Sequence, residues 1–284
     1  MVGKEKLILV TGAAGMLGRR LMLDAPAGVE AVPVTRAEVD LAERDQVARL
    51  FSERGPFRGV IHAAGYTDVD GAEREPLRAW RDNRDPTREL AAACARAAIP
   101  LLMVSTDFVF DGRADRPYSE TDAPAPLGVY GKTKWAAERL AEVYHPGGVC
   151  VARTAWLYGP GKRHFVEKIL ERARGGGVLE VVADQHGSPT STLELAPALW
   201  DLLVRDARGL YHAACEGACT RLEWARAILE LAGVEGVDLR PAKSSGSHRP
   251  AYSALDCSKL ARLRGRPMAP WREALKRYLE GEFK

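Results

Sequence analysis

The sequence is poor in features that would mark a specialised class of protein. It has only five cysteines among 284 residues, and aromatic residues make up 7% of the chain. Basic and acidic residues are nearly balanced, 41 against 38, and no block of lysine and arginine stands out. This balance gives no support to binding of nucleic acid or of a membrane surface.

Long apolar runs are also lacking. None reaches the roughly 18–20 residues that a membrane-spanning helix needs, and the apolar run near the N-terminus is too short to predict a signal peptide. The cysteines are scattered, and Cys215 and Cys219 lack the Cys-x-x-Cys spacing of redox and zinc sites. We therefore expect five reduced, buried thiols in a cytoplasmic protein.

The first half of the chain alternates short apolar runs with helical patterns. Strands are expected at 6–10, 30–34, 59–64, 100–105 and 148–153, and helices at 15–25, 44–55, 85–98 and from 129 onward. Such alternation with short connections predicts an α/β fold, a doubly wound parallel sheet of the Rossmann type with right-handed crossovers.

The second half is less regular. We expect helices at 161–177, 191–207, 220–233 and 271–283, strands near 179–185 and 209–214, and a loop over 242–256. The predicted organisation is a Rossmann nucleotide-binding domain over 1–156 that the chain rejoins at about 180–213. A smaller, discontinuous C-terminal domain, mainly 157–179 and 214–284, would bind the substrate.

A glycine pattern follows the first strand. The string TGAAGMLG places Gly12, Gly15 and Gly18 between a strand and a helix. Glycines there permit a sharp turn, close approach of a pyrophosphate and tight packing of the helix on the sheet, with the helix dipole facing the phosphates. This context predicts a dinucleotide site that includes Gly12, Gly15, Met16 and Leu17.

The end of the second strand bears on the choice of cofactor. Arg36 can pair with the 2′-phosphate of NADPH, whereas an acidic residue here would hold the ribose of NADH. Glu38 lies nearby, so NADH stays open. Asp40 and Leu41 follow where an adenine would lie.

The third and fourth strands end in residues suited to the same site. The third strand ends in Ala63, Ala64 and Gly65, which are small enough to let a cofactor pass closely, and Tyr66 follows as a further cofactor-binding residue. The fourth strand ends in Ser105, Thr106 and Asp107. His62 fits a structural role better than acid–base catalysis, since it precedes the small residues.

A tyrosine and a lysine one helical turn apart follow a proline-rich loop. Tyr130 and Lys134 lie on one face of the expected helix. The spacing alone fits either a solvated helix start or a proton donor beside a lysine that lowers its pKa. The converging strand ends favour the proton donor.

These motifs together resemble the extended short-chain dehydrogenase/reductases and, within them, the dTDP-4-dehydrorhamnose reductase family. The strings that carry the resemblance, from about residue 6 to residue 256, are GAAGMLG, AAGYTDVDGAE, STDFVFDG, YGKTKWAAE, RTAWLYG, DQHGSPT and RPAYSALD. Phe108 stands where the family often has tyrosine, and His62 where many members have asparagine. The resemblance implies reduction of the 4-keto group of dTDP-4-dehydro-L-rhamnose to dTDP-L-rhamnose by NADPH.

The resemblance also implies roles for individual residues. Tyr130 would donate the proton, Lys134 would lower the pKa of the phenol and bond the nicotinamide ribose, and Thr106 would bond the substrate carbonyl. Strand geometry alone leaves Ser105 and Thr106 nearly equal, and the resemblance favours Thr106. Related dehydratases need an Asp–Glu pair after this position, so Asp107 followed by Phe108 favours simple reduction over elimination.

The substrate side is less well defined by sequence. Trp156 could wall off the sugar, and Arg249 could pair with a diphosphate through its planar fork. Asp107 fits either a substrate contact or a helix cap. Gln185 and Thr190 are expected to shape the cleft. Two further tryptophans, Trp224 and Trp271, fit amphipathic helices and are expected in the core.

Several alternatives stay open at this level. The chain could act on another nucleotide sugar as a reductase or epimerase, or serve as a non-catalytic regulatory subunit like that of methionine adenosyltransferase. The intact set of Thr106, Tyr130 and Lys134 argues against loss of catalysis. The resemblance also leaves a homodimer and a magnesium requirement open, and no cluster of metal ligands is assigned.

Overall fold

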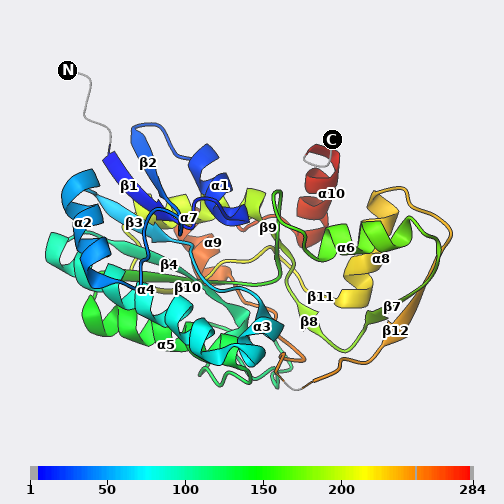
Figure 1. Ribbon diagram of the computed structural model, residues 1–284. Coiled ribbons are helices and arrows are strands. Elements are labelled where there is room, and N and C mark those ends of the chain that lie inside the picture. The colour runs from blue at the N-terminus through cyan, green and yellow to red at the C-terminus, as the bar shows by residue number, and fades with distance from the viewer. Residues whose placement is uncertain (1–5, 247, 282–284) are drawn as a thin grey trace.

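A six-stranded parallel sheet forms the centre of the protein in the computed structural model, which describes residues 6–246 and 248–281 (Figure 1). The strand order is β10-β5-β4-β3-β1-β2, and every neighbouring pair is parallel. The strands are β1 (Lys6–Thr11), β2 (Val29–Val34), β3 (Gly59–His62), β4 (Leu101–Thr106), β5 (Val149–Thr154) and β10 (Gly209–His212). The α/β Rossmann-type prediction is therefore confirmed.

Helices cover both faces of this sheet. One face carries α1 (Met16–Leu23) and α7 (Thr192–Val204), and the other carries α2 (Arg44–Arg54), α4 (Pro76–Ala97) and α5 (Val129–Tyr144). The strand order reverses between β1 and β3, because β2 lies on one side of β1 and the later strands lie on the other. At such a switch point the carboxyl ends of the strands form a crevice in which open α/β sheets bind ligands.

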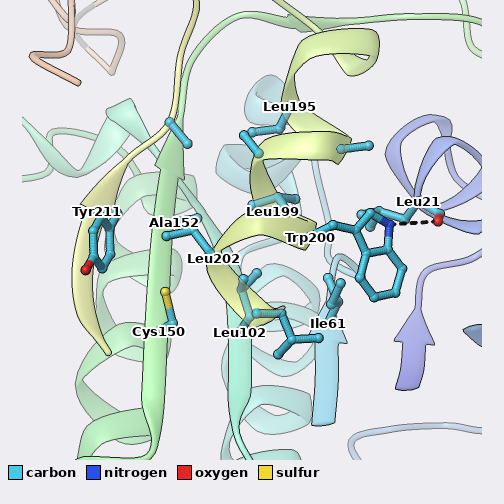
Figure 2. Packing of buried hydrophobic residues seen from close by; sticks show 14 of the residues in the cluster. Leu21, Ile61, Leu102, Cys150, Ala152, Leu195, Leu199, Trp200, Leu202 and Tyr211 are labelled. Atoms are coloured by element: carbon cyan, nitrogen blue, oxygen red, sulfur yellow. Dashed lines mark hydrogen bonds between the residues drawn. The ribbon is translucent and has the colours of Figure 1, made fainter. Parts of the chain in front are cut away.

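Helix α7 belongs to the second half of the chain and packs on the central sheet. Leucines of α7 pack on Leu102 of β4 and on Cys150 of β5, as Figure 2 shows. The indole Nε1 of Trp200 donates a hydrogen bond of 3.0 Å to the carbonyl oxygen of Leu21 in α1. This bond fixes α7 beside the helix that follows the glycine loop.

A second layer lies beyond the sheet, on the right of Figure 1. Its strands β7 (Gly177–Val182) and β12 (Val237–Ala242) pair in parallel. Its helices are α6 (Phe165–Ala173), α8 (Arg221–Leu231) and α10 (Trp271–Gly281). They share a core that includes Tyr158, Trp224 and Tyr278.

Short elements connect the sheet to this layer. Two-residue pairs join β6 (Leu157–Tyr158) to β9 (Thr190–Ser191) and β8 (His186–Gly187) to β11 (Cys219–Thr220). The remaining elements are α3 (Val69–Arg74), the 3₁₀ turn η1 (Asp107–Val109) and α9 (Ser258–Arg264). Leu260 of α9 packs in the core under the sheet rather than in the second layer.

Some boundaries differ from the expected ones. The helix expected at 85–98 begins at Pro76 and continues through Pro86, because the charged stretch around Asn83 is helical. The hydroxyl of Thr87 donates to the carbonyl oxygen of Asn83 at 3.0 Å within this turn. The helix expected at 161–177 spans only Phe165–Ala173, because Gly177 already opens β7.

Two other expectations concern the chain as a whole. All five cysteines carry free thiols, as predicted, and four of them are buried, whereas Cys257 is only half-buried. Among the residues that the structure describes, no helix combines the length and apolar character needed to cross a membrane. Of the helix expected at 271–283, residues 282 and 283 lie outside the described chain.

Candidate functional site

One cavity of about 700 Å³ opens at the carboxyl ends of the sheet strands and extends to the second layer. Most of the residues that the sequence predicts for the cofactor, the chemistry or the substrate line it. These residues are Gly12, Gly15, Met16, Leu17, Arg36, Asp40, Leu41, Ala63, Ala64, Tyr66, Thr106, Asp107, Tyr130, Lys134, Trp156 and Arg249. Segments far apart in the sequence therefore form one site.

The glycine loop has the shape that a dinucleotide needs. Gly12 has a φ of +71°, and a Cβ there would lie 2.8 Å from the backbone nitrogen of Ala64. The loop therefore passes against the end of β3 with no room for a side chain. Gly15 caps the N-terminus of α1, whose dipole faces the cavity. These residues fit a bound nicotinamide dinucleotide.

Charged side chains surround the part of the cavity that follows the end of β2. The guanidinium of Arg36 pairs with both carboxylate oxygens of Asp82, at 2.5 and 3.1 Å, and its side chain remains 64% exposed. Asp40 pairs with Arg81 at 2.5 Å. Glu38 accepts hydrogen bonds from the backbone and hydroxyl of Thr35, both at 2.8 Å, so its carboxylate is held in a turn.

Tyr130 and Lys134 lie on one face of α5 and both line the cavity. Desolvation raises the pKa of Tyr130 to about 12 and lowers that of Lys134 to about 8. The ammonium of Lys134 donates to the carbonyl oxygen of Val104 at 2.8 Å. The expected lowering of the Tyr130 pKa by Lys134 is thus not seen in the protein itself, because burial dominates and the ammonium bonds the backbone of β4.

Ser105 and Thr106 have different side-chain partners in the structure. The hydroxyl of Ser105 donates to Glu138 at 2.5 Å, and this carboxylate also accepts two bonds from the buried guanidinium of Arg153, at 3.0 and 2.6 Å. The hydroxyl of Thr106 donates to Asp107 at 3.0 Å and opposes the rise in the pKa of Tyr130. Of the two hydroxyls, that of Thr106 is therefore the one that acts on the tyrosine.

Asp107 is buried at the end of β4. One carboxylate oxygen faces the Thr106 hydroxyl and the other accepts a bond of 2.6 Å from Ser253. Burial raises the pKa of Asp107 to about 6, while these bonds and the nearby Arg221 work against the rise. Phe108 stands edge-on to Tyr130, with ring centroids 5.6 Å apart, so no second carboxylate accompanies Asp107 at that position.

The end of the cavity next to the second layer is aromatic. Trp156 has a left-handed backbone (φ 43°), and its ring stacks on Trp224 with centroids 5.6 Å apart. Trp224 is buried as predicted, yet it also lines the cavity. Arg249 lines the cavity with its guanidinium on Asp70, at 2.7 and 2.9 Å.

Some residues have other positions than sequence suggests. Gln185 and Thr190, expected to shape the cleft, are buried and do not line the cavity. His62 is buried with Nδ1 2.7 Å from the Thr11 hydroxyl, and burial lowers its pKa to about 3. It therefore has the structural role that we favoured.

Three site residues were missed by sequence reasoning. The amide of Asn83 bonds both the backbone nitrogen and carbonyl of Tyr66, at 2.7 and 3.2 Å, and the hydroxyl of Thr133 at 3.0 Å. It ties the end of β3 to α5. Ser253 holds Asp107, and Arg221 lies over Trp156. The sequence signal for Asn83 is a single uncharged amide within the charged run of residues 81–85.

Within residues 6–246 and 248–281, no group of three or more histidine, cysteine, aspartate or glutamate side chains could hold an ion.

Comparison with known proteins relates this architecture to characterised ones. The family model described as "RmlD substrate binding domain" matches residues 6–283. The dTDP-4-dehydrorhamnose reductase of Mycobacterium tuberculosis is 39% identical, over 97% of this chain and 93% of its own. Crystal structures of such reductases from Bacillus anthracis, in complex with NADP, and from Clostridium acetobutylicum superpose with TM-scores of 0.92 and 0.91. The Bacillus anthracis protein is 31% identical over 98% of this chain and 100% of its own. The Clostridium acetobutylicum protein is 33% identical over 96% of this chain and 98% of its own.

The fold and the site define an extended short-chain dehydrogenase/reductase, in which a glycine cradle for a dinucleotide meets a Tyr–Lys pair at the edge of a parallel sheet. Within this class, the chain belongs to the dTDP-4-dehydrorhamnose reductase family.

Proposed function

We propose that the protein reduces the 4-keto group of dTDP-4-dehydro-L-rhamnose to dTDP-L-rhamnose, with NADPH as the reductant. One observation carries this proposal: Thr106, Tyr130 and Lys134 line the same cavity as the glycine cradle and the aromatic wall around Trp156. A ketone held between them would touch both the acid and the cofactor.

The sheet side would hold the cofactor. Gly12, Gly15, Met16 and Leu17 would bind the pyrophosphate, and Lys134 would bond the nicotinamide ribose. A dihydronicotinamide bound there would supply the hydride.

We propose NADPH rather than NADH because of the state of Arg36 and Glu38. Arg36 is largely exposed at the rim of the cavity and can turn its planar fork to a 2′-phosphate. Glu38 is held by Thr35 and so is poorly placed to bond a ribose hydroxyl. Asp40 and Leu41 would flank the adenine, and Ala63, Ala64 and Tyr66 would line the path of the cofactor.

Tyr130 would deliver the proton. Its high pKa keeps the phenol protonated at neutral pH, and an alkoxide is basic enough to take a proton from such a phenol. The hydroxyl of Thr106 would bond the carbonyl oxygen and stabilise the charge that develops there. Lys134, still largely protonated at neutral pH with a pKa of about 8, would favour the phenolate left behind.

The second layer would hold the nucleotide sugar. Trp156 would wall the sugar, Asp107 would contact its hydroxyls, and Arg249 would lie near the diphosphate. In this view residues 157–179 and much of 214–284 form the substrate-binding part of the molecule, and β10 and α7 return to the cofactor-binding part.

The test is oxidation of NADPH, followed by absorbance, with dTDP-, UDP- and GDP-linked 4-keto sugars. We expect turnover with dTDP-4-dehydro-L-rhamnose and conversion to dTDP-L-rhamnose by chromatography. Preference for a UDP- or GDP-sugar would change the substrate and keep the reaction. Absence of ketone reduction together with stable co-purification of a synthetase would favour a regulatory subunit instead.

A further inference from the structure

Arg221 is a cation of the cavity that the mechanism above does not use. It follows β11 directly and is the first residue of α8, at the point where the second layer meets the cavity. Its guanidinium lies 3.5 Å from the ring centroid of Trp156, and 5.2 and 5.5 Å from those of Phe165 and Trp224. The flat face of the group is therefore fixed by stacking, while its N–H donors point out from the edges.

These donors have no partner among the described residues. No carboxylate lies within ion-pair distance of the Arg221 guanidinium, and only its backbone nitrogen is bonded, to the carbonyl oxygen of Gln185 at 3.3 Å. Burial lowers the pKa of Arg221 to about 9, with Arg249 lowering it further and Asp107 raising it. A desolvated, unpaired guanidinium is costly unless a ligand supplies the opposite charge.

Arg249, expected to bind the diphosphate, is in the opposite situation. Its guanidinium makes a bidentate pair with Asp70, beside His248 at 3.0 Å from the same carboxylate. The charge of Arg249 is therefore already compensated, while the charge of Arg221 is not. An anion entering this end of the cavity would relieve the repulsion between the two guanidiniums.

We infer that Arg221, held flat against Trp156, binds the diphosphate of the nucleotide sugar and that Arg249 is secondary. This inference rests on the proposed function, because it assumes a nucleoside diphosphate ligand. Arginine suits the role because its fork matches phosphate oxygens in a bidentate fashion, and stacking leaves both edges free for that contact.

The experiment uses the protein saturated with NADP⁺ and measures inhibition constants of dTDP and of thymidine, which lacks the phosphates. For Arg221→Gln we expect dTDP binding to weaken about 10- to 100-fold, the size of a charge-assisted hydrogen bond. Thymidine binding should stay unchanged. The KM for the nucleotide sugar should rise in parallel with little change in kcat, since a diphosphate contact is equally strong in the ground state and in the transition state.

Two further variants keep the test decisive. Arg249→Gln should weaken dTDP less than threefold, as a matched control in the same cavity. Arg221→Lys retains the charge but not the fork, so it should show an intermediate loss even if the glutamine variant folds poorly.

Three results would overturn the inference. Equal losses of dTDP and thymidine in Arg221→Gln would mean that the residue only supports the fold. Unchanged dTDP binding, in a wild-type enzyme that reduces the ketone, would refute this inference alone. A wild-type protein that neither binds dTDP nor reduces the ketone would refute the proposed function too.

Discussion

The two sides of the cavity are built in different ways. On the sheet side, the lining residues lie at the ends of regular elements. They belong to the glycine loop between β1 and α1, to the ends of β3 and β4, and to the first turns of α5. On the second-layer side, the wall is assembled from short segments around residues 156, 165, 221 and 249. Their positions depend on two-residue strand pairs and aromatic stacking.

This difference separates what local patterns can specify from what they cannot. The strand before a glycine loop and the helix after it fix the position of the loop. The residues of the sheet side can therefore be assigned from their neighbours in the sequence. On the other side Arg221 is placed over Trp156 by the pairing of β8 with β11, and no spacing within either segment announces that contact. The following substitutions probe the two sides, from the largest expected effect to the smallest.

Tyr130→Phe should remove the proton donor and leave the fold intact. We expect kcat to fall by about 10²–10⁴, the range for loss of a general acid. NADPH binding and the midpoint of thermal unfolding should stay near wild type, since only one hydroxyl is lost. The measurement is steady-state NADPH oxidation, and a kcat within tenfold of wild type would reject Tyr130 as the donor.

Glu138→Gln should destabilise the sheet side strongly. It leaves Arg153, 3% exposed, without its carboxylate partner, and breaking a buried pair in this way costs about 3–5 kcal/mol. The matched control in the second layer is Arg163→Ala, whose partner Glu171 is 41% exposed; it should cause no measurable change. Denaturant unfolding compares the two, and similar losses would contradict the contrast.

Asp107→Asn should change how stability depends on pH. A buried acid whose pKa is raised from 3.8 to about 6 stabilises the fold below pH 4 and loses that contribution as pH rises through about 6. The wild type should therefore lose about 2 kcal/mol relative to the variant between pH 4 and pH 7. The amide can donate to Ser253, whose hydroxyl can turn to the carbonyl of His186, 3.4 Å away. A pH-independent difference would contradict this assignment.

Arg36→Ala should shift the preference between cofactors. Loss of a charge-assisted contact to the 2′-phosphate should lower kcat/KM for NADPH about tenfold and leave the value for NADH nearly unchanged. Arg84→Ala is the control, since Arg84 lies on α4 away from the cavity and pairs with Asp85. An unaltered ratio of the two kcat/KM values would mean that Arg36 serves only its pair with Asp82.

The sequence predicted the parallel sheet and the residues that line its crevice, because both follow from short-range patterns. It could not predict that α4 begins at Pro76, since Pro86 and the charges around Asn83 look like a helix boundary. Nor could it assign Arg221 or Ser253, whose partners Trp156 and Asp107 lie 65 (221 − 156) and 146 residues away in the chain. It also predicted the wrong sign for the Tyr130 pKa, because burial cannot be read from a spacing.

The most direct test of the account follows the hydride itself. NADPH carrying deuterium at both C4 positions of the nicotinamide is incubated with the protein and dTDP-4-dehydro-L-rhamnose, and the product is examined by NMR and mass spectrometry. We predict dTDP-L-rhamnose with one deuterium at C4 of the sugar. Oxidation of NADPH without that label, or no turnover from a folded protein that binds both ligands, would contradict the claim that this cavity aligns cofactor and ketone for direct transfer.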